Sequence, residues 1–333
     1  MTLLITGCGS IGSRHARNVI SLGETVLLHD VNPVSAVNLA QELNAKKENC
    51  AGVADSLAQG IAQKPFALLV CTPPNDHVAA ALIGVNANIP IFIEKPLCHD
   101  DNVNELVRIA SERNIPVMVA CNMRFTEGLQ KVKSIIPLLG KLWSARIEFG
   151  YDLRLWRPGS DYSKNYAASW DTGGGIVLDA VHELDYALWL FGEVKKSFSN
   201  VGKSSILNIE TEDWADFLLF CERCPSVSIH VDYLQPEYTR FCVIHGENGS
   251  VWWDFKKGTV RTIIAGKESV VETNTDINAM YVEEIKHFLN AVRNKTPITN
   301  PLSEAARTHM LALELRKKGL ATQGLTDTQG DLV

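Results

Sequence analysis

The chain opens with Thr2-Leu-Leu-Ile-Thr-Gly7-Cys-Gly9-Ser-Ile-Gly12, an apolar run that ends in three glycines spaced G-x-G-x-x-G. The run predicts a strand, and residues 13–20 after the glycines predict a helix. Such a strand, turn and helix bind a dinucleotide pyrophosphate, with Gly7 for the tight turn, Gly9 for close approach and Gly12 for helix packing. The N-terminus of the helix adds free N–H groups and a positive dipole end. The residues expected to line this site are Gly7, Gly9, Ser10, Ile11 and Gly12.

Length and composition indicate an ordinary globular protein with room for two domains. The chain has 333 residues, of which 46% are hydrophobic and 21% charged. A net charge of -6 argues against a nucleic-acid partner. No apolar run approaches the roughly 20 residues of a membrane span, and Met1 leads straight into a strand, so neither a membrane segment nor a signal peptide is expected. Eight scattered cysteines favour a reducing cytoplasm.

Cys221 and Cys224 form the only C-x-x-C motif. A structural zinc ion needs four ligands, and no second pair follows at a usable spacing. The pair also lies between two runs that predict strands. We therefore interpret these cysteines as turn residues of a hairpin and predict no metal site there.

Asp30 ends the second predicted strand, residues 24–30. A carboxylate at this place accepts hydrogen bonds from the adenosine ribose and repels a 2′-phosphate, which favours NAD over NADP. The alternative is a turn residue before Asn32-Pro33, a role that aspartate often has.

Strands and helices continue to alternate up to residue 121, which predicts a doubly wound parallel sheet. Two later strands are fully apolar, as buried parallel strands are. The first, residues 66–71, ends in a loop that contains Thr72, Pro73 and His77, and the second, residues 89–93, ends in Glu94-Lys95-Pro96. Ligands of open α/β sheets bind at the carboxyl ends of such strands.

Lys95 lies at the end of a strand that is otherwise apolar. Near a nicotinamide ring, positive charge and partial desolvation would both lower the pKa of its ammonium group. That makes Lys95 a candidate proton donor or hydrogen-bond partner for a reacting oxygen. The alternative is a structural Glu94–Lys95 pair before a proline.

Beyond residue 121 the pattern changes to a second α/β domain with an open, mainly antiparallel sheet. A helix over residues 128–139 and a long strand over 141–150 precede it, and two helices, 280–293 and 303–318, close the chain. The expected strands lie at 211–220, 226–233, 239–245, 249–255 and 259–265. The predicted division is a Rossmann domain (1–121), a substrate-binding and oligomerisation domain (122–325) and a flexible tail (326–333).

His182 is the candidate acid/base of this second domain. It follows Gly173-Gly-Gly175 in a predicted helix over residues 176–190, where Asp179 and Asp185 lie one turn away on either side and could fix the imidazole tautomer. A lone histidine is more often structural. A metal site of Asp179, His182 and Asp185 is a minor alternative, because no further residue completes the ligand set.

Several motifs, in order, resemble the glucose–fructose oxidoreductase / inositol dehydrogenase / rhizopine-catabolism (Gfo/Idh/MocA) family. They are Gly7-Cys-Gly-Ser-Ile-Gly12, Thr72-Pro73…His77, Glu94-Lys95-Pro96, Asn122-Met-Arg-Phe125 and Gly173-Gly-Gly…Asp179…His182. The resemblance implies a Rossmann domain, a second domain whose open sheet makes dimers or tetramers, and a sugar-like substrate bound between the two.

The resemblance also assigns roles. It implies that Lys95 is the catalytic lysine, His182 the acid/base and Asp179 its carboxylate partner, while Glu94 and Thr72 line the nicotinamide half of the cofactor. One departure weakens the role of Asp179, since the commonest family spacing puts histidine four residues after aspartate and here it is three. Asp185 is the alternative orienting carboxylate.

The expected reaction is reversible oxidation of a secondary alcohol on a sugar-like ring, with hydride transfer to NAD. Aromatic side chains in residues 151–170 suit a sugar face, and basic ones suit a carboxylate or phosphate, so a sugar acid or nucleotide sugar is a candidate substrate. The residues expected at the substrate are Arg124, Arg154, Trp156, Arg157, Tyr162, Asp179 and His182. Any one of the loop side chains could instead be solvated surface or core.

Two other functions fit the same scaffold. The first is a glycosidase that oxidises its sugar transiently on bound NAD, and the second is a non-catalytic NAD-sensing regulator. A regulator needs neither Lys95 nor His182, so their joint presence argues against it. The sequence leaves open the particular sugar, the direction of reaction, the oligomer size and the isomer of the Lys95–Pro96 bond.

Overall fold

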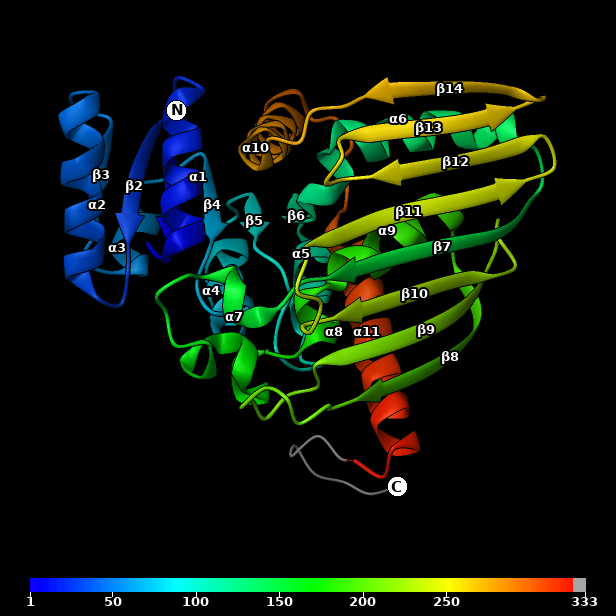
Figure 1. Ribbon diagram of the computed structural model, residues 1–333. Coiled ribbons are helices and arrows are strands. Elements are labelled where there is room, and N and C mark those ends of the chain that lie inside the picture. Colours follow the sequence, from blue (N-terminus) through cyan, green and yellow to red (C-terminus); the bar gives the residue numbers. More distant parts are fainter. Residues whose placement is uncertain (326–333) are drawn as a thin grey trace. The chain divides into compact units, whose positions relative to one another are not determined.

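In the computed structural model, which describes residues 1–325, Met1–Cys121 and Asn278–Arg307 form one compact unit, and Asn122–Ile277 with the residues from Thr308 onward form a second (Figure 1). Both helices near the C-terminus were expected in the second domain. Residues 278–307 instead group with the Rossmann sheet, so the first of these helices belongs to the first unit and the second is divided between the two units. The tail expected at 326–333 lies outside the described residues.

A six-stranded sheet organises the first unit. Its order is β3-β2-β1-β4-β5-β6 and every neighbouring pair is parallel. This is the predicted doubly wound Rossmann sheet. The strands are β1 (Thr2–Thr6), β2 (Thr25–His29), β3 (Ala51–Val53), β4 (Ala67–Val70), β5 (Ile91–Ile93) and β6 (Val117–Val119).

Helices connect these strands, and sequence signals fix several of their ends. The side chain of Asn32 accepts from Val34 N, with Pro33 at the first helical position, and Ser56 caps the next helix by accepting from Gln59 N. The helices are α1 (Ser10–Ser21), α2 (Pro33–Lys46), α3 (Leu57–Ala62), η1 (Pro74–Asp76), α4 (His77–Asn86) and α5 (Asn104–Glu112), joined later in the chain by α10 (Ile277–Asn294) and the start of α11 (Leu302–Thr322).

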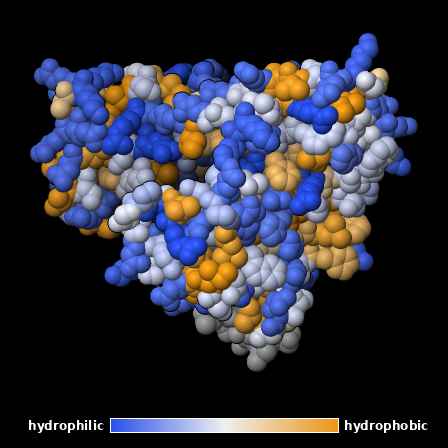
Figure 2. Space-filling view, in the orientation of Figure 1, coloured by the Kyte–Doolittle hydropathy of each residue, from blue (hydrophilic) through white to orange (hydrophobic). Residues whose placement is uncertain are grey.

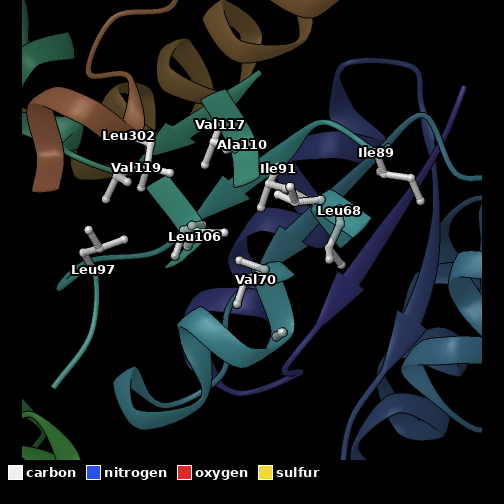
Figure 3. Packing of buried hydrophobic residues seen from close by; sticks show 14 of the residues in the cluster. Leu68, Val70, Ile89, Ile91, Leu97, Leu106, Ala110, Val117, Val119 and Leu302 are labelled. Atoms are coloured by element: carbon white, nitrogen blue, oxygen red, sulfur yellow. The ribbon is translucent and has the colours of Figure 1, made fainter. Parts of the chain in front are cut away.

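The core on one side of this sheet shows why the strand sequences are so apolar. Leu68 of β4 and Ile91 of β5 are register partners, and both are fully buried. A side chain at Gly84 of α4 would come within 2.4 Å of Ile91, so that glycine lets the helix lie close to the strands. Leu302 of α11 joins the same cluster (Figure 3). Burial on both faces explains the continuous hydrophobic runs.

The second unit contains an eight-stranded sheet in the order β14-β13-β12-β11-β7-β10-β9-β8. Only β10 and β7 pair in parallel, and the other six pairs are antiparallel. The predicted mainly antiparallel sheet is therefore confirmed. The strands are β7 (Leu142–Gly150), β8 (Val194–Gly202), β9 (Trp214–Cys221), β10 (Val227–Asp232), β11 (Thr239–Gly246), β12 (Gly249–Asp254), β13 (Thr259–Ile264) and β14 (Lys267–Glu272).

The two edge strands were not predicted. All six residues of β14 are exposed, and β8 alternates only weakly because it is polar or half-buried along most of its length. An edge strand that buries little apolar surface leaves little periodicity to read.

Helices cover one face of this sheet and leave the other open (Figure 1). They are α6 (Glu127–Ile135), α8 (Ile176–Asp179), α9 (Val181–Phe191) and the later part of α11. The unit also contains the short helical turns α7 (Leu153–Trp156), η2 (Asn122–Phe125), η3 (Ile136–Leu139), η4 (Tyr162–Lys164), η5 (Tyr166–Ala168) and η6 (Trp170–Thr172). The open face carries apolar side chains among polar ones (Figure 2). One shallow depression on it, of about 500 Å³, is lined by Phe198, Leu218 and His230, among others.

The helix predicted over residues 176–190 is interrupted. Ala180 has φ -93° and ψ 27°, which ends α8, and α9 starts at Val181. Asp179 and His182 therefore do not lie on one continuous helical face. No glycine or proline stands at this point of the sequence, so the sequence did not predict the interruption.

The hairpin predicted at Cys221 and Cys224 is confirmed. Cys221 ends β9, its N–H donates to the Cys224 carbonyl at 2.9 Å, and β10 begins at Val227. Both thiols are free.

His230 on the open face generates a prediction about pH. Its Nδ1 is 2.8 Å from Asp216 Oδ1 and its Nε2 is 3.0 Å from Asp232 Oδ2, and the bond to Asp232 is the main reason that the pKa of His230 is raised to about 9. Because this exceeds the unfolded value of about 6.5, the stabilisation is complete below about pH 6.5 and is lost as the pH rises through 9.

We expect His230→Gln to lower the free energy of unfolding by about 1 kcal/mol at pH 6, since the group is partly exposed and screened. The difference from the wild type should disappear near pH 10. Chemical denaturation at both pH values measures it, and an equal loss at pH 6 and pH 10 would contradict the assignment.

Candidate active site

The glycine turn after β1 has the geometry that the motif predicts. Gly7 has φ +91°, and a side chain there would come within 2.4 Å of the Cys71 carbonyl oxygen. A Cβ on Gly12 would lie 1.8 Å from the Gly7 carbonyl oxygen, so α1 packs against the turn at backbone distance. A Cβ on Gly9 would meet no atom within 4 Å. The turn is therefore closed on its inner side and open where phosphates would approach.

Asp30 is fixed beside this turn. Its Oδ2 accepts from Cys8 N at 2.6 Å and its Oδ1 from Asn32 N at 2.8 Å. The carboxylate thus serves the local turn, as the alternative interpretation expects, and also contacts the glycine loop, while its bond to a ribose stays a prediction. Burial, followed by the charge of Asp30, raises the pKa of the Cys8 thiol to about 12 and keeps it protonated.

His77 holds together the loops that follow β4 and β5. One ring nitrogen is 2.8 Å from the Thr72 carbonyl oxygen and the other is 2.9 Å from that of Pro96. The ring is buried, and burial lowers its pKa below the usual value. Since both nitrogens contact backbone, we assign His77 to supporting these loops rather than to direct cofactor contact.

Thr72 and Pro73 remain at the mouth of β4. Among the residues that the structure describes, the buried Thr72 hydroxyl has no hydrogen-bond partner, whereas buried hydroxyls normally have one. Pro73 is exposed. A hydroxyl of this kind at the carboxyl end of a central strand can accept or donate one bond to a bound ligand.

Glu94 and Lys95 follow β5 directly, and the Lys95–Pro96 peptide is cis. Burial opposes ionisation of Glu94, but a hydrogen bond and charge from His15, together with the charge of Lys95, hold the pKa of its carboxyl below the usual value. Its Oε2 also accepts from Lys95 N at 3.1 Å. The first unit therefore presents an open glycine turn, a threonine hydroxyl without a partner among the described residues and a carboxylate beside a lysine, all at the carboxyl ends of its strands, where a dinucleotide binds in this fold.

In the second unit, Asp179 is held by two tyrosines. Tyr166 donates its hydroxyl to Oδ1 at 2.5 Å, and Tyr233 donates to Oδ2 at 2.9 Å. Asp179 is 4% exposed and Tyr233 is fully buried. The carboxylate therefore joins the loop that contains Tyr166 to the end of β10.

His182 lies in the first turn of α9 and is 7% exposed. The next residue, Glu183, forms a buried ion pair with Arg240 of β11, with Oε1 2.9 Å from Arg240 Nε. This pair ties the start of α9 to the sheet, and so fixes the backbone that carries His182.

Arg124, which the sequence analysis expected at the substrate, is paired with a carboxylate of its own unit. Its guanidinium is 2% exposed and donates to both oxygens of Asp185, at 2.7 and 2.8 Å. Such a bidentate pair uses the geometry of both groups. Asp185 is thereby occupied by Arg124, which also removes the basis for choosing it as the carboxylate that orients His182.

The loop after β7 carries the remaining expected substrate residues. Arg154 pairs with Asp152 at 2.6 Å and its side chain stays half exposed. Trp156 donates to the Tyr151 carbonyl at 3.0 Å, and its ring packs edge-on against Phe149 and Tyr233, which makes it structural.

Arg157 and Tyr162 differ in how they are held. The Arg157 guanidinium lies 6.0 Å from the centre of the Tyr166 ring and is exposed. The Tyr162 hydroxyl accepts from Asn208 N at 3.3 Å. Of the four loop residues, the two arginines are the ones best placed to meet an anion in solvent.

Trp170 anchors the end of this loop. Its indole N–H donates at 2.8 Å to Glu212, which also accepts from Val177 N at 3.2 Å. Glu212 is buried, and burial raises its pKa. A side chain at Gly175 would come within 2.3 Å of Glu212, and its φ of +99° also favours glycine, so this last glycine of the three permits the close packing.

Three residues near the site were not identified from the sequence. Tyr233 is the last residue of a predicted strand, and its position gave no sign that it bonds to Asp179. His15 and Tyr281 surround Glu94, but they come from α1 and α10, far from it in the sequence. In the sequence His15 stands between Arg14 and Ala16, which gave no signal of its burial.

The fold and the glycine turn define a dinucleotide-binding protein of the Rossmann type. The family model for an oxidoreductase family with an NAD-binding Rossmann fold matches residues 1–121, and the model for the GFO/IDH/MocA C-terminal domain matches residues 129–252. The chain belongs to the Gfo/Idh/MocA oxidoreductase family, as its motifs indicated.

Individual relatives are distant. An inositol 2-dehydrogenase of Burkholderia multivorans is 26% identical over 315 residues, which cover 90% of this chain and 89% of that protein. Among solved structures, a levoglucosan dehydrogenase in complex with NADH and levoglucosan superposes with a TM-score of 0.85 at 16% identity, covering 96% of this chain and 97% of that one. A UDP-N-acetylglucosamine 3-dehydrogenase from Acidithiobacillus ferrooxidans gives 0.80 at 20% identity, covering 96% and 98%. The structural likenesses establish the shared fold.

Two features are absent from the residues that the structure describes. No helix there is both long and apolar enough to cross a membrane. Within residues 1–325, no three histidine, cysteine, aspartate or glutamate side chains are grouped so as to hold a metal ion.

The two hydrogen bonds from tyrosines to Asp179 lead to a prediction about stability. Tyr233→Phe removes one hydroxyl donor from a buried carboxylate, so we expect a loss of about 1–3 kcal/mol in the free energy of unfolding. Tyr151→Phe is the matched control, because Tyr151 makes an edge contact with Tyr238 through its ring. Urea denaturation compares the two, and equal stability of both variants and the wild type would show that the bond to Asp179 contributes nothing.

Proposed function

We propose that the protein is an NAD-dependent dehydrogenase that reversibly oxidises a secondary hydroxyl of a sugar, sugar acid or nucleotide sugar. The observation that carries the proposal is that a chain of this family contains both a lysine after β5 and a buried histidine in α9. Lys95 directly follows β5 in the unit with the cofactor turn, and His182 is buried in the first turn of α9. Relatives named inositol 2-dehydrogenase and levoglucosan dehydrogenase support a polyol or sugar substrate.

In the proposed mechanism, His182 takes the proton from the substrate hydroxyl as general base. Lys95 donates a hydrogen bond to the same oxygen and stabilises the negative charge that develops on it. When bound, the nicotinamide supplies the hydride acceptor. In the reverse direction, His182 returns the proton to the carbonyl oxygen. Asp179, held by its two tyrosines, keeps the short helix before His182 in place.

We propose NAD as the cofactor in preference to NADP. The carboxylate of Asp30 is oriented by two backbone N–H groups, at the strand end where a ribose would bind. Its charge would repel a 2′-phosphate, and the residues that follow, Val31 and Asn32, offer no cation to attract one.

The substrate class follows from the loop after β7. Arg157 and Arg154 place exposed guanidinium groups on a loop that is tied to Asp179 through Tyr166. Guanidinium groups bind carboxylates and phosphates well, so an acidic sugar or a nucleotide sugar suits this loop better than a neutral polyol. The UDP-sugar dehydrogenase of the same fold is consistent with the second choice.

We further propose that the protein forms a homodimer or homotetramer through the open face of the β7–β14 sheet. Phe241, Val243 and Trp252 line a second depression of about 340 Å³ on that face, and contiguous apolar surface of this kind commonly marks an interface. The eight free cysteines suit a reducing compartment, so we place the enzyme in the cytoplasm.

The central test is turnover. A panel of sugars, sugar acids and nucleotide sugars, each with NAD and NADP, should give reduced cofactor from at least one substrate, and faster with NAD. On that substrate we expect Lys95→Ala and His182→Ala each to lower kcat about 100-fold or more, with little change in NAD affinity. Lys141→Ala and His245→Ala, which change the same residue types away from the motifs, serve as controls.

Full turnover in both the Lys95 and His182 variants would contradict the proposed roles. Hydrolysis of a nitrophenyl glycoside without consumption of NAD would show the glycosidase instead of the dehydrogenase.

The oligomer has its own test. Val243→Glu places a charge in the apolar depression, where it would be buried on assembly, so we expect it to shift the protein towards monomers. Leu138→Glu, at a residue that is 57% exposed in η3, is the control and should leave the assembly unchanged. Sedimentation velocity measures both, and a monomeric wild type would refute the proposal.

A further inference from the structure

His15 is a fully buried histidine in the second turn of α1, the helix that starts at the glycine turn. Its ring packs edge-on against Phe92 of β5 and Tyr281 of α10, with centroids 5.2 and 5.7 Å away. An aromatic hydrocarbon would fill this space equally well. The polar atom therefore needs a separate reason.

The reason is Glu94. His15 Nε2 lies 2.5 Å from Glu94 Oε1, and Glu94 Oε2 accepts from the backbone N–H of Lys95 at 3.1 Å. A short chain of bonds thus leads from the phosphate-binding helix to the lysine at the end of β5. All three residues belong to the same compact unit.

The carboxylate depends on this support. Glu94 is 7% exposed, and without His15 it would keep the Lys95 N–H as a donor but lose its bond from α1, so that burial would favour the protonated form. Arg14 and Tyr281 lie nearby, but Arg14 stacks on the Tyr281 ring at 4.7 Å, so its cation is directed to that ring. His15 is the side chain that hydrogen-bonds Glu94 from α1.

We propose that His15 is a positioning residue that holds the Glu94 carboxylate, and with it the Lys95 backbone, at the nicotinamide end of the cofactor site, and that the charge held there favours NAD⁺ over NADH. The inference rests on the NAD dependence proposed above. The oxidised ring is positively charged and the reduced ring is neutral, so an adjacent anion stabilises only the oxidised form. Removal of either His15 or Glu94 has the same result, because both changes leave a neutral group at residue 94.

The test measures binding and needs no substrate. Dissociation constants for NAD⁺ and NADH are determined by isothermal titration for the full-length wild type, His15→Phe, Glu94→Gln, the double variant and His15→Gln. We expect the preference for NAD⁺ to fall about tenfold in both single variants, which corresponds to about 1.4 kcal/mol, and to fall no further in the double variant. His15→Gln keeps an N–H donor and should retain most of the preference.

Asn18→Ala is the matched control for damage to α1. Asn18 is also buried in this helix and hydrogen-bonds Asn278 of α10, so its loss should change both dissociation constants equally. Thermal unfolding checks that each variant is folded.

Additive effects of His15→Phe and Glu94→Gln would overturn the proposal, as would an unchanged ratio of the two constants in both. A protein that shows the expected ratios but oxidises no sugar would disprove the proposed reaction and leave the role of His15 intact.

Discussion

The close approach of α1 to the turn after β1 is the constraint on which the first unit depends. Any side chain at residue 12 would overlap the Gly7 carbonyl oxygen, at 1.8 Å. Because the helix can lie this close, its N-terminus faces the open side of the turn at Gly9. The same approach directs His15 inward to Glu94. One backbone contact thus positions both the N-terminus of α1 at the glycine turn and the histidine that supports the loop after β5.

The second unit is organised around a buried carboxylate. The Asp179 carboxylate needs the hydrogen bonds from the two tyrosine hydroxyls, because a buried charge without donors would be strongly destabilising. Its bonds determine where the loop with Tyr166 lies relative to β10. Two buried ion pairs also fix positions in this unit, Arg124 with Asp185 and Arg240 with Glu183. Polar groups here fix positions that apolar packing alone would leave loosely specified.

Hydrophobic patterning predicted most of the architecture and little of the polar network. The six strands of the Rossmann sheet were predictable because burial on both faces makes continuous apolar runs. The edge strands β8 and β14 were not, since they bury little, and the break at Ala180 follows from packing rather than from a residue type. Lys95 and Glu94 were found because they follow a strand directly.

The bonds of Arg124, Tyr233 and His15 were beyond prediction because each joins positions far apart in the chain. Arg124 is 61 residues from Asp185, and His15 is 79 from Glu94. A single sequence shows that such groups are present, but not which of them meet. The pairing of Arg124 with Asp185 was missed for this reason.

The division of the chain also bears on the order of events during synthesis. Cys121 N donates to Glu284 of α10 at 2.7 Å, and Met118 forms a bridge with Pro301, so the far edge of the Rossmann sheet is finished by residues made much later. While the ribosome completes the intervening segment, the nascent sheet lacks that cover and exposes apolar surface. Intermediates with exposed apolar surface are the ones that chaperones protect, and the first domain is completed only by residues 278–307, in the last sixth of the chain.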